Sequence, residues 1–328
     1  MSRIEKMATK VKNKPAHWAA INEVSFLAGM KLMFWICRLF GRWPFRLVLY
    51  PVLLWYVLMQ GSARRASQAY LQRVQQYTNV STGWWGVMRH FAAFAEMMLD
   101  KMLLWNDLFD TSSVQYFGLE QMDSLIQKKR GAVIICAHLG NLDLCRILSA
   151  QHSHLKLTVL VHTRHAQVFN QMLASINPAS ELNLLQVTEM NPATAMLLAE
   201  KVAQGEFIVI AGDRVPVAAN PRVAIAEFLG KPAPFAIGPY VLASILQCPL
   251  YTLFSMRTAV DGHSEMHFEI LRESVRLPRK GRDVVLAQLA QDYAARLQRY
   301  CVGAPLQWFN FYDYWFLPQV DTSDATEH

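Results

Sequence analysis

The chain has 328 residues, of which 53% are hydrophobic, 11% aromatic and only 17% charged. This length suits one large domain or two modest ones, and the composition excludes disordered, collagen-like and coiled-coil proteins. Residues 1–75 hold twelve Lys and Arg against two acids, whereas the other 253 residues hold 20 bases and 23 acids. The basicity therefore belongs to the N-terminal quarter, which indicates an anionic membrane surface as a partner and argues against nucleic acid.

The N-terminal region, residues 1–78, reads as a basic and apolar membrane-associating helical region. Its longest uncharged run, 47–63, has 17 residues, which is at the short limit for a membrane span. Pro51 and the neighbouring Arg and Trp side chains favour helices that lie in the membrane interface over a single span. A buried pair of core helices is the third alternative.

After helices expected over 64–78 and 84–104, the pattern changes to alternating strands and helices. We expect strands over 132–138, 157–161, 182–187, 207–213, 249–255 and 265–271, and helices over 141–151, 165–176, 191–204, 236–247 and 282–300. The alternation predicts an α/β fold with a mostly parallel central sheet flanked by helices. This domain should span 79–318, followed by a polar tail over 319–328.

Cysteine and histidine usage gives no sign of disulfides or metal. The five cysteines are scattered without a CxxC spacing, which indicates a reducing compartment, and the ten histidines lack zinc-like companion ligands. We therefore expect no metal site.

Titratable side chains follow two of the predicted strands, where functional residues of such sheets collect. His138 ends one strand and Asp143 lies in the first turn of the next helix; Asp213 and Arg214 follow another strand. A tight turn at Gly140 can fold the histidine back over the helix and bring the Asp143 carboxylate to the imidazole. An aspartate at one ring nitrogen lets the other nitrogen accept a proton.

This arrangement provides a base and its orienting carboxylate without a nucleophile of the protein's own, since the chain has no G-x-S-x-G motif. It suits the activation of a substrate hydroxyl. Backbone N–H groups near 139–141, or a nearby cation, can hold an oxyanion. The alternative interpretation is structural, with His138 as a partner of the helix cap and Asp143 as a first-turn charge.

Four segments together resemble the bacterial lipid A late acyltransferases, within the wider glycerolipid and lysophospholipid acyltransferase superfamily with its His-x4-Asp motif. They are AHLGNLDL at the His-x4-Asp block, AGDRVP at 211–216, EFLGKPAPFAIGPYVLASILQCPLY at 227–251 and PLQWFNFYDYW at 305–315. With the basic N-terminus, the resemblance covers about 20–320.

The resemblance implies a role for each matched residue. His138 is the general base and Asp143 its orienter, while Gly140 and Asn141 shape the turn. Arg214 contacts a phosphate of donor or acceptor, and Asp213 positions it. Two further candidates for substrate binding are Arg164, in the same pocket, and Gly230, at a turn that closes the site.

The expected activity is acyl transfer at the cytoplasmic face of a bacterial inner membrane by a monomer, monotopic or with a single span. The acyl group comes from acyl carrier protein, or from coenzyme A, and goes to a hydroxyl of a lipid A-like, glycolipid or other lipid acceptor. No cofactor is expected, because the thioester supplies the activated carbonyl. The alternatives are a lysophospholipid or glycerol-phosphate acyltransferase and a non-catalytic lipid-binding tether.

Overall fold

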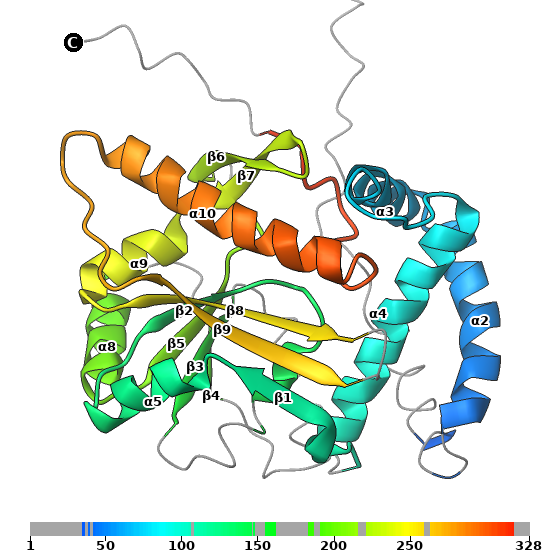
Figure 1. The fold of residues 1–328 in the computed structure, drawn as a ribbon, viewed down its shortest axis with the longest axis horizontal. Coiled ribbons are helices and arrows are strands. Elements are labelled where there is room, and N and C mark those ends of the chain that lie inside the picture. The colour runs from blue at the N-terminus through cyan, green and yellow to red at the C-terminus, as the bar shows by residue number, and fades with distance from the viewer. Residues whose placement is uncertain are drawn as a thin grey trace, which may run out of the picture.

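The fold centres on one large sheet with helices on both faces (Figure 1). The computed structural model describes residues 35–36, 39, 42–105, 108–145, 147, 155–161, 183–186, 191–215, 221–258 and 263–317.

The central sheet has seven strands in the order β1-β9-β8-β2-β5-β3-β4. The strands are β1 (Val114–Phe117), β2 (Val133–Cys136), β3 (Leu157–Val161), β4 (Asn183–Gln186), β5 (Phe207–Ala211), β8 (Leu250–Arg257) and β9 (Ser264–Arg272). Five neighbouring strands from β8 to β4 run parallel, whereas β9 is antiparallel to β8 and parallel to the edge strand β1. The predicted α/β class with a mostly parallel sheet is confirmed.

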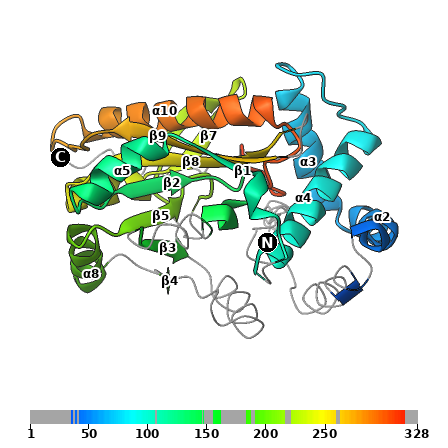
Figure 2. The same cartoon turned by 60° about the horizontal axis from the view of Figure 1, so that its bottom comes forward.

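Side chains of β2 alternate between the two faces of the sheet and belong to two separate cores. Val133 and Ile135 pack in the core that contains α8 (Pro192–Ala203), α9 (Gly238–Leu246) and α10 (Arg282–Gly303). Ile134 and Cys136 pack in a second core with α5 (Leu119–Gln127). Burial of both strand faces explains the continuous apolar runs of the sequence. Figure 2 shows α10 running along the sheet.

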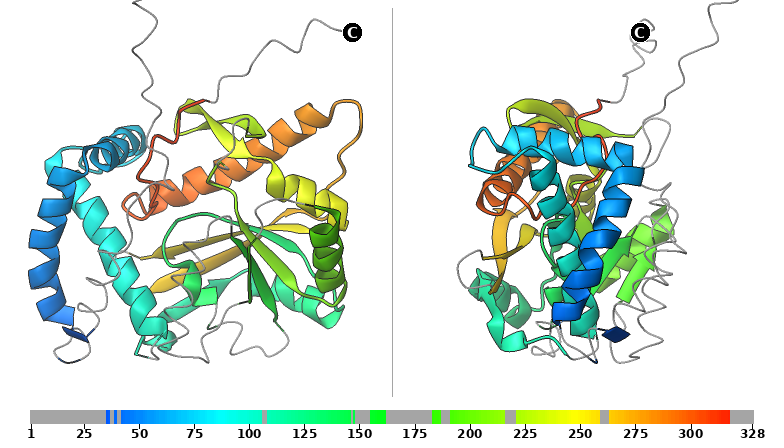
Figure 3. Two further views of the ribbon diagram at one scale, coloured as in Figure 1. Left: turned by 180° about the vertical axis from the view of Figure 1, so that it is seen from behind. Right: turned by 90° about the vertical axis from the view of Figure 1, so that its right-hand side faces the viewer.

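Three helices stand together at one end of the sheet: α2 (Arg42–Met59), α3 (Gly61–Val74) and α4 (Trp84–Trp105) (Figure 3). The α2 helix packs on α4, and Arg46 joins them through an ion pair with Glu96 at 2.8 Å. Among the described residues, none of the helices combines the length and apolarity that a bilayer crossing requires.

A small antiparallel hairpin, β6 (Val223–Phe228) and β7 (Lys231–Ala236), packs against α10. The expected strands include none over 223–236, where the structure has two, and Pro232 and Pro234, which argue against a strand, lie within β7. Each strand of a two-stranded sheet has one free edge, so proline can face outward without removing a ladder bond.

Most other predicted elements agree with the structure, with three differences. Helix α5 and strand β1 were not predicted. The helix expected over 141–151 begins as the short 3-10 turn η3 (Leu142–Leu144), and most of its remaining range lies outside the described residues. The helix expected over 165–176 lies wholly outside them.

Candidate active site

His138 and Asp213 meet because the strands that precede them are neighbours in register. Strand β2 pairs with β5 in parallel, with Cys136 opposite Ala211, and each titratable residue lies two positions beyond that pair. The imidazole Nδ1 of His138 lies 2.8 Å from Oδ1 of Asp213. A histidine–carboxylate pair therefore stands at the carboxyl ends of two central strands.

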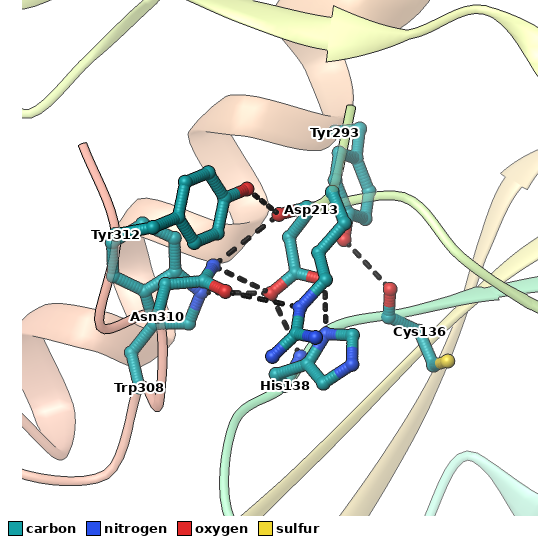
Figure 4. A network of polar contacts seen from close by, with 8 residues as sticks. Cys136, His138, Asp213, Tyr293, Trp308, Asn310 and Tyr312 are labelled. Carbon is teal, nitrogen blue, oxygen red and sulfur yellow. Dashed lines mark hydrogen bonds and ion pairs between the residues drawn. The ribbon is translucent and has the colours of Figure 1, made fainter. Parts of the chain in front are cut away.

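Asp213 is fully buried and accepts hydrogen bonds at both carboxylate oxygens (Figure 4). Its Oδ2 accepts from the His138 backbone N–H at 2.8 Å, the Trp308 indole Nε1 at 2.9 Å and the Asn310 amide Nδ2 at 3.1 Å. Burial raises the pKa of Asp213, but the imidazole and the Arg214 guanidinium outweigh burial, and the net shift is downward. Asp213 is therefore ionised at neutral pH.

The His138 ring is neutral at neutral pH and presents one unprotonated nitrogen. Burial lowers its pKa, as do the cations Arg214 and Lys101, and the opposing effect of Asp213 is smaller. Since an ionised carboxylate only accepts, Nδ1 carries the proton and Nε2 the lone pair. The side chain is 34% exposed, and Figure 4 shows its second nitrogen turned away from the polar network. This nitrogen can accept a proton from a molecule that approaches from solvent.

A close backbone approach shapes the turn after His138. Gly140 has a φ of +61°, and a Cβ atom there would lie 2.2 Å from the carbonyl oxygen of Ser255. The Gly140 N–H donates to the Gln307 carbonyl at 2.9 Å, and the Phe309 N–H donates to the His138 carbonyl at 2.7 Å. The C-terminal segment 305–317 is thus paired with the histidine loop and forms a wall of the site.

Asp143 does not occupy the position that the sequence predicts. Its Oδ2 lies 2.7 Å from the Nζ of Lys101 in α4, and the carboxylate bonded to the imidazole is Asp213 instead. The reason is the local geometry: Asn141 caps η3, its Oδ1 accepting the Asp143 N–H at 3.2 Å, and η3 packs against α4.

Three further site residues were predicted: Arg214, Gly230 and Arg164. Arg214 belongs to the network, its Nε donating to Oδ1 of Asn310 at 3.4 Å. Gly230 occupies the β6–β7 turn with a φ of +72°, where its nearest neighbours are Gln76 and Tyr77. Arg164 lies outside the described residues.

Four candidate functional residues were not predicted from the sequence: Trp308, Asn310, Lys101 and His90. Trp308 and Asn310 donate to Asp213 from a segment that the sequence marks only as an aromatic C-terminal stretch. Lys101 and His90 lie in the apolar helix α4 and carry no local motif. Their contacts are with segments that pack against α4 only in the folded chain, so the local sequence does not reveal them.

His90 connects this wall to the helices. Its Nε2 lies 2.9 Å from the Trp308 carbonyl and its Nδ1 2.9 Å from the Ser67 hydroxyl. A carbonyl only accepts, so Nε2 carries the proton and Nδ1 accepts from Ser67. Burial lowers the pKa of His90 to about 4. The ring is neutral and fixes Trp308, whose indole in turn holds Asp213.

This burial predicts a pH-dependent stability. The unfolded histidine binds a proton near pH 6.5 and the folded one only near 4, so stability is lost as pH falls through this interval, by about 3 kcal/mol. Urea unfolding between pH 7 and 4 should show this loss in the wild type and a shallower slope in His90→Gln. Equal slopes would show that His90 is not buried as a neutral ring.

In the described part of the chain, no three His, Cys, Asp or Glu side chains gather to hold a metal ion. A family model described as bacterial lipid A biosynthesis acyltransferase matches residues 80–316. No curated protein matches the chain.

Proposed function

We propose that this chain, which belongs to the bacterial lipid A biosynthesis acyltransferase family, moves a fatty acyl group from an acyl carrier protein thioester to a hydroxyl of a lipid A-like or other glycolipid acceptor. The observation that carries the proposal is the neutral His138, a partly exposed ring that is bonded through Nδ1 to the buried Asp213 and has its second nitrogen turned away from the polar network. Acyl-coenzyme A is the second candidate donor.

The chemistry follows from the protonation states. Nε2 of His138 takes the proton of the acceptor hydroxyl while the hydroxyl oxygen bonds to the thioester carbonyl carbon. The carbonyl electrons move to oxygen and return when the carbon–sulfur bond breaks, and the imidazolium gives its proton to the departing thiolate. Asp213 stabilises the transient imidazolium and stays ionised throughout.

The developing oxyanion needs a positive partner. The Gly140 N–H already donates to the Gln307 carbonyl, so this member of the turn is unsuited to an oxyanion. The Arg214 guanidinium lies close enough to lower the pKa of His138 and is held by Asn310. We assign the oxyanion, or a phosphate of the acceptor, to Arg214.

We further propose that the chain works at the cytoplasmic face of a bacterial inner membrane, and the outer face of α2 supports contact with a membrane surface. Leu49, Leu53 and Val57 pack inward, yet the opposite face is equally apolar and includes Trp43, 71% exposed, and Trp55, 66% exposed. A helix that is apolar all round requires a second apolar neighbour. An interfacial position within the bilayer surface supplies that neighbour without a span.

Two charges on this face should therefore weaken membrane binding. The variant with Trp43→Glu and Trp55→Glu should lose at least ~10-fold in affinity for vesicles of phosphatidylethanolamine and phosphatidylglycerol, because each glutamate replaces a buried apolar side chain in the interface. Co-sedimentation with the vesicles measures this affinity. The matched control is the variant with Met196→Glu and Val284→Glu, both 74% exposed on other helices. Equal affinity in the two double variants contradicts the assignment.

The proposed reaction is tested by mass spectrometry of lipids. The purified protein in detergent is incubated with a total bacterial lipid extract and either acyl carrier protein thioesters or acyl-coenzyme A. A glycolipid that gains the mass of one acyl chain supports the proposal, and the more productive thioester identifies the donor. A product found only among phospholipids indicates the lysophospholipid acyltransferase instead, and no product with either donor indicates a lipid-binding tether.

A further inference from the structure

Helix α4 carries charges that meet the loops around the site. Asp100 pairs with Arg257 at the end of β8 at 3.4 Å, and the next residue, Lys101, pairs with Asp143 in η3 at 2.7 Å. The second pair is largely buried, with the lysine side chain 22% and the aspartate 12% exposed. Lys101 is also close enough to His138 to act on its charge.

We propose that Lys101 is a positioning residue of the acyl-transfer site, which holds the Asp143 carboxylate away from the imidazole and so leaves Asp213 as the carboxylate paired with His138. The inference rests on the proposed function, since it concerns the base of that reaction.

The physical reason lies in the two ring nitrogens. Nδ1 of His138 is already bonded to Asp213, so a second carboxylate at Nε2 would place the ring between two negative charges. Such a ring binds a second proton, because each carboxylate then accepts an N–H bond. The imidazolium could no longer accept the proton of a hydroxyl. The Lys101 ammonium prevents this by neutralising Asp143 and by opposing a positive ring.

The charged and titratable groups near His138 come from each neighbouring element. Asp213 and Arg214 after β5 and Lys101 on α4 act on its charge directly. Around them, Asp143 in η3 pairs with Lys101, Asp100 on α4 pairs with Arg257 on β8, and Cys136 on β2 and Tyr312 in the C-terminal segment are influenced by Asp213. Within the described chain, Lys101 is the cation that links an acidic side chain of the His-x4-Asp turn to α4.

The test is a titration of His138 itself, by NMR of ¹³C-labelled histidine rings in the full chain, with His138→Ala to assign the signal. Lys101→Met should raise the midpoint by about one pH unit, because a nearby cation is lost and a carboxylate is uncovered. Lys101→Arg should retain the wild-type midpoint. Asp143→Asn should lower the midpoint, and the double variant Lys101→Met with Asp143→Asn should return toward the wild type.

The acid limb of kcat/KM should move with the NMR midpoint in each variant, which loss of folded protein alone does not produce. The matched control is Lys201→Met: Lys201 pairs with Glu206 at 2.9 Å with a side-chain exposure of 23%, and leaves the site intact. An unchanged midpoint in Lys101→Met, or a shift equal to that of Lys201→Met, overturns the inference. Failure of the proposed function is separate, because it would appear as absent acyl transfer in the wild type while the NMR titration still reports on Lys101.

Discussion

His138→Ala is expected to lower the rate of acyl transfer by ~10²–10⁴-fold, the usual contribution of a positioned general base. The alanine removes the Nε2 lone pair of this partly exposed ring, whereas the backbone N–H that donates to Asp213 remains in place. The measurement is kcat with the acyl carrier protein thioester and bacterial lipid extract, on samples of equal folded content.

A second histidine provides the control for this substitution. His267 also pairs with a carboxylate, Glu265, at 2.8 Å, and its side chain is 20% exposed, yet it lies on β9 away from the polar network. His267→Ala should therefore keep wild-type turnover per folded molecule. Turnover of His138→Ala equal to that of His267→Ala would remove His138 from the reaction.

Asp213→Asn should have the largest combined effect, on activity and on stability. The carboxylate accepts three N–H groups at Oδ2 and the imidazole at Oδ1. An amide oxygen can replace Oδ2, but its NH₂ group then faces Nδ1, which must become the acceptor and move the ring proton to Nε2. The base is lost with the tautomer, and we expect a fall of about 10⁴-fold in kcat.

The same substitution should lower the free energy of unfolding by about 3 kcal/mol, since it replaces the buried ionised acceptor of these hydrogen bonds by a neutral amide that mismatches Nδ1 of His138. The lowered pKa of Asp213 determines how this difference in unfolding free energy changes with pH. Its contribution is complete above the ordinary carboxyl range and is lost as pH falls through the folded pKa, so wild type and variant should converge in acid. Urea unfolding at pH 7 and pH 3 measures both. A stability difference that is unchanged at pH 3 contradicts an ionised Asp213.

The sequence placed His138, Asp143 and Asp213 among the site residues but paired His138 with Asp143, whereas the carboxylate bonded to its imidazole is Asp213. His138 and Asp143 are close in the chain, and nothing in the local pattern reveals that β2 lies beside β5. Once that strand order is known, the register of Cys136 with Ala211 places Asp213 at the imidazole. Contact between distant segments is a property of the folded sheet, so spacing along the chain could not supply it.

Other features were not predicted from the sequence for similar reasons. Strand β1 has four residues at the sheet edge, too short for a clear alternation of apolar and polar side chains. Strand β7 holds two prolines, which argue against a strand unless one edge is free. Lys101 was unremarkable as one of several charged side chains in a largely apolar helix, and its importance appears only when η3 packs on α4.

The central claim is that His138, bonded to Asp213, is the general base of an acyl transfer, while Asp143 forms an ion pair with Lys101. The most direct measurement compares Asp213→Asn with Asp143→Asn in single-turnover transfer of a radiolabelled acyl group from acyl carrier protein to bacterial lipid at neutral pH. We predict that Asp143→Asn stays within about tenfold of the wild type and that Asp213→Asn falls by about 10³-fold or more. Equal loss in the two variants, or a greater loss in Asp143→Asn, would contradict the account.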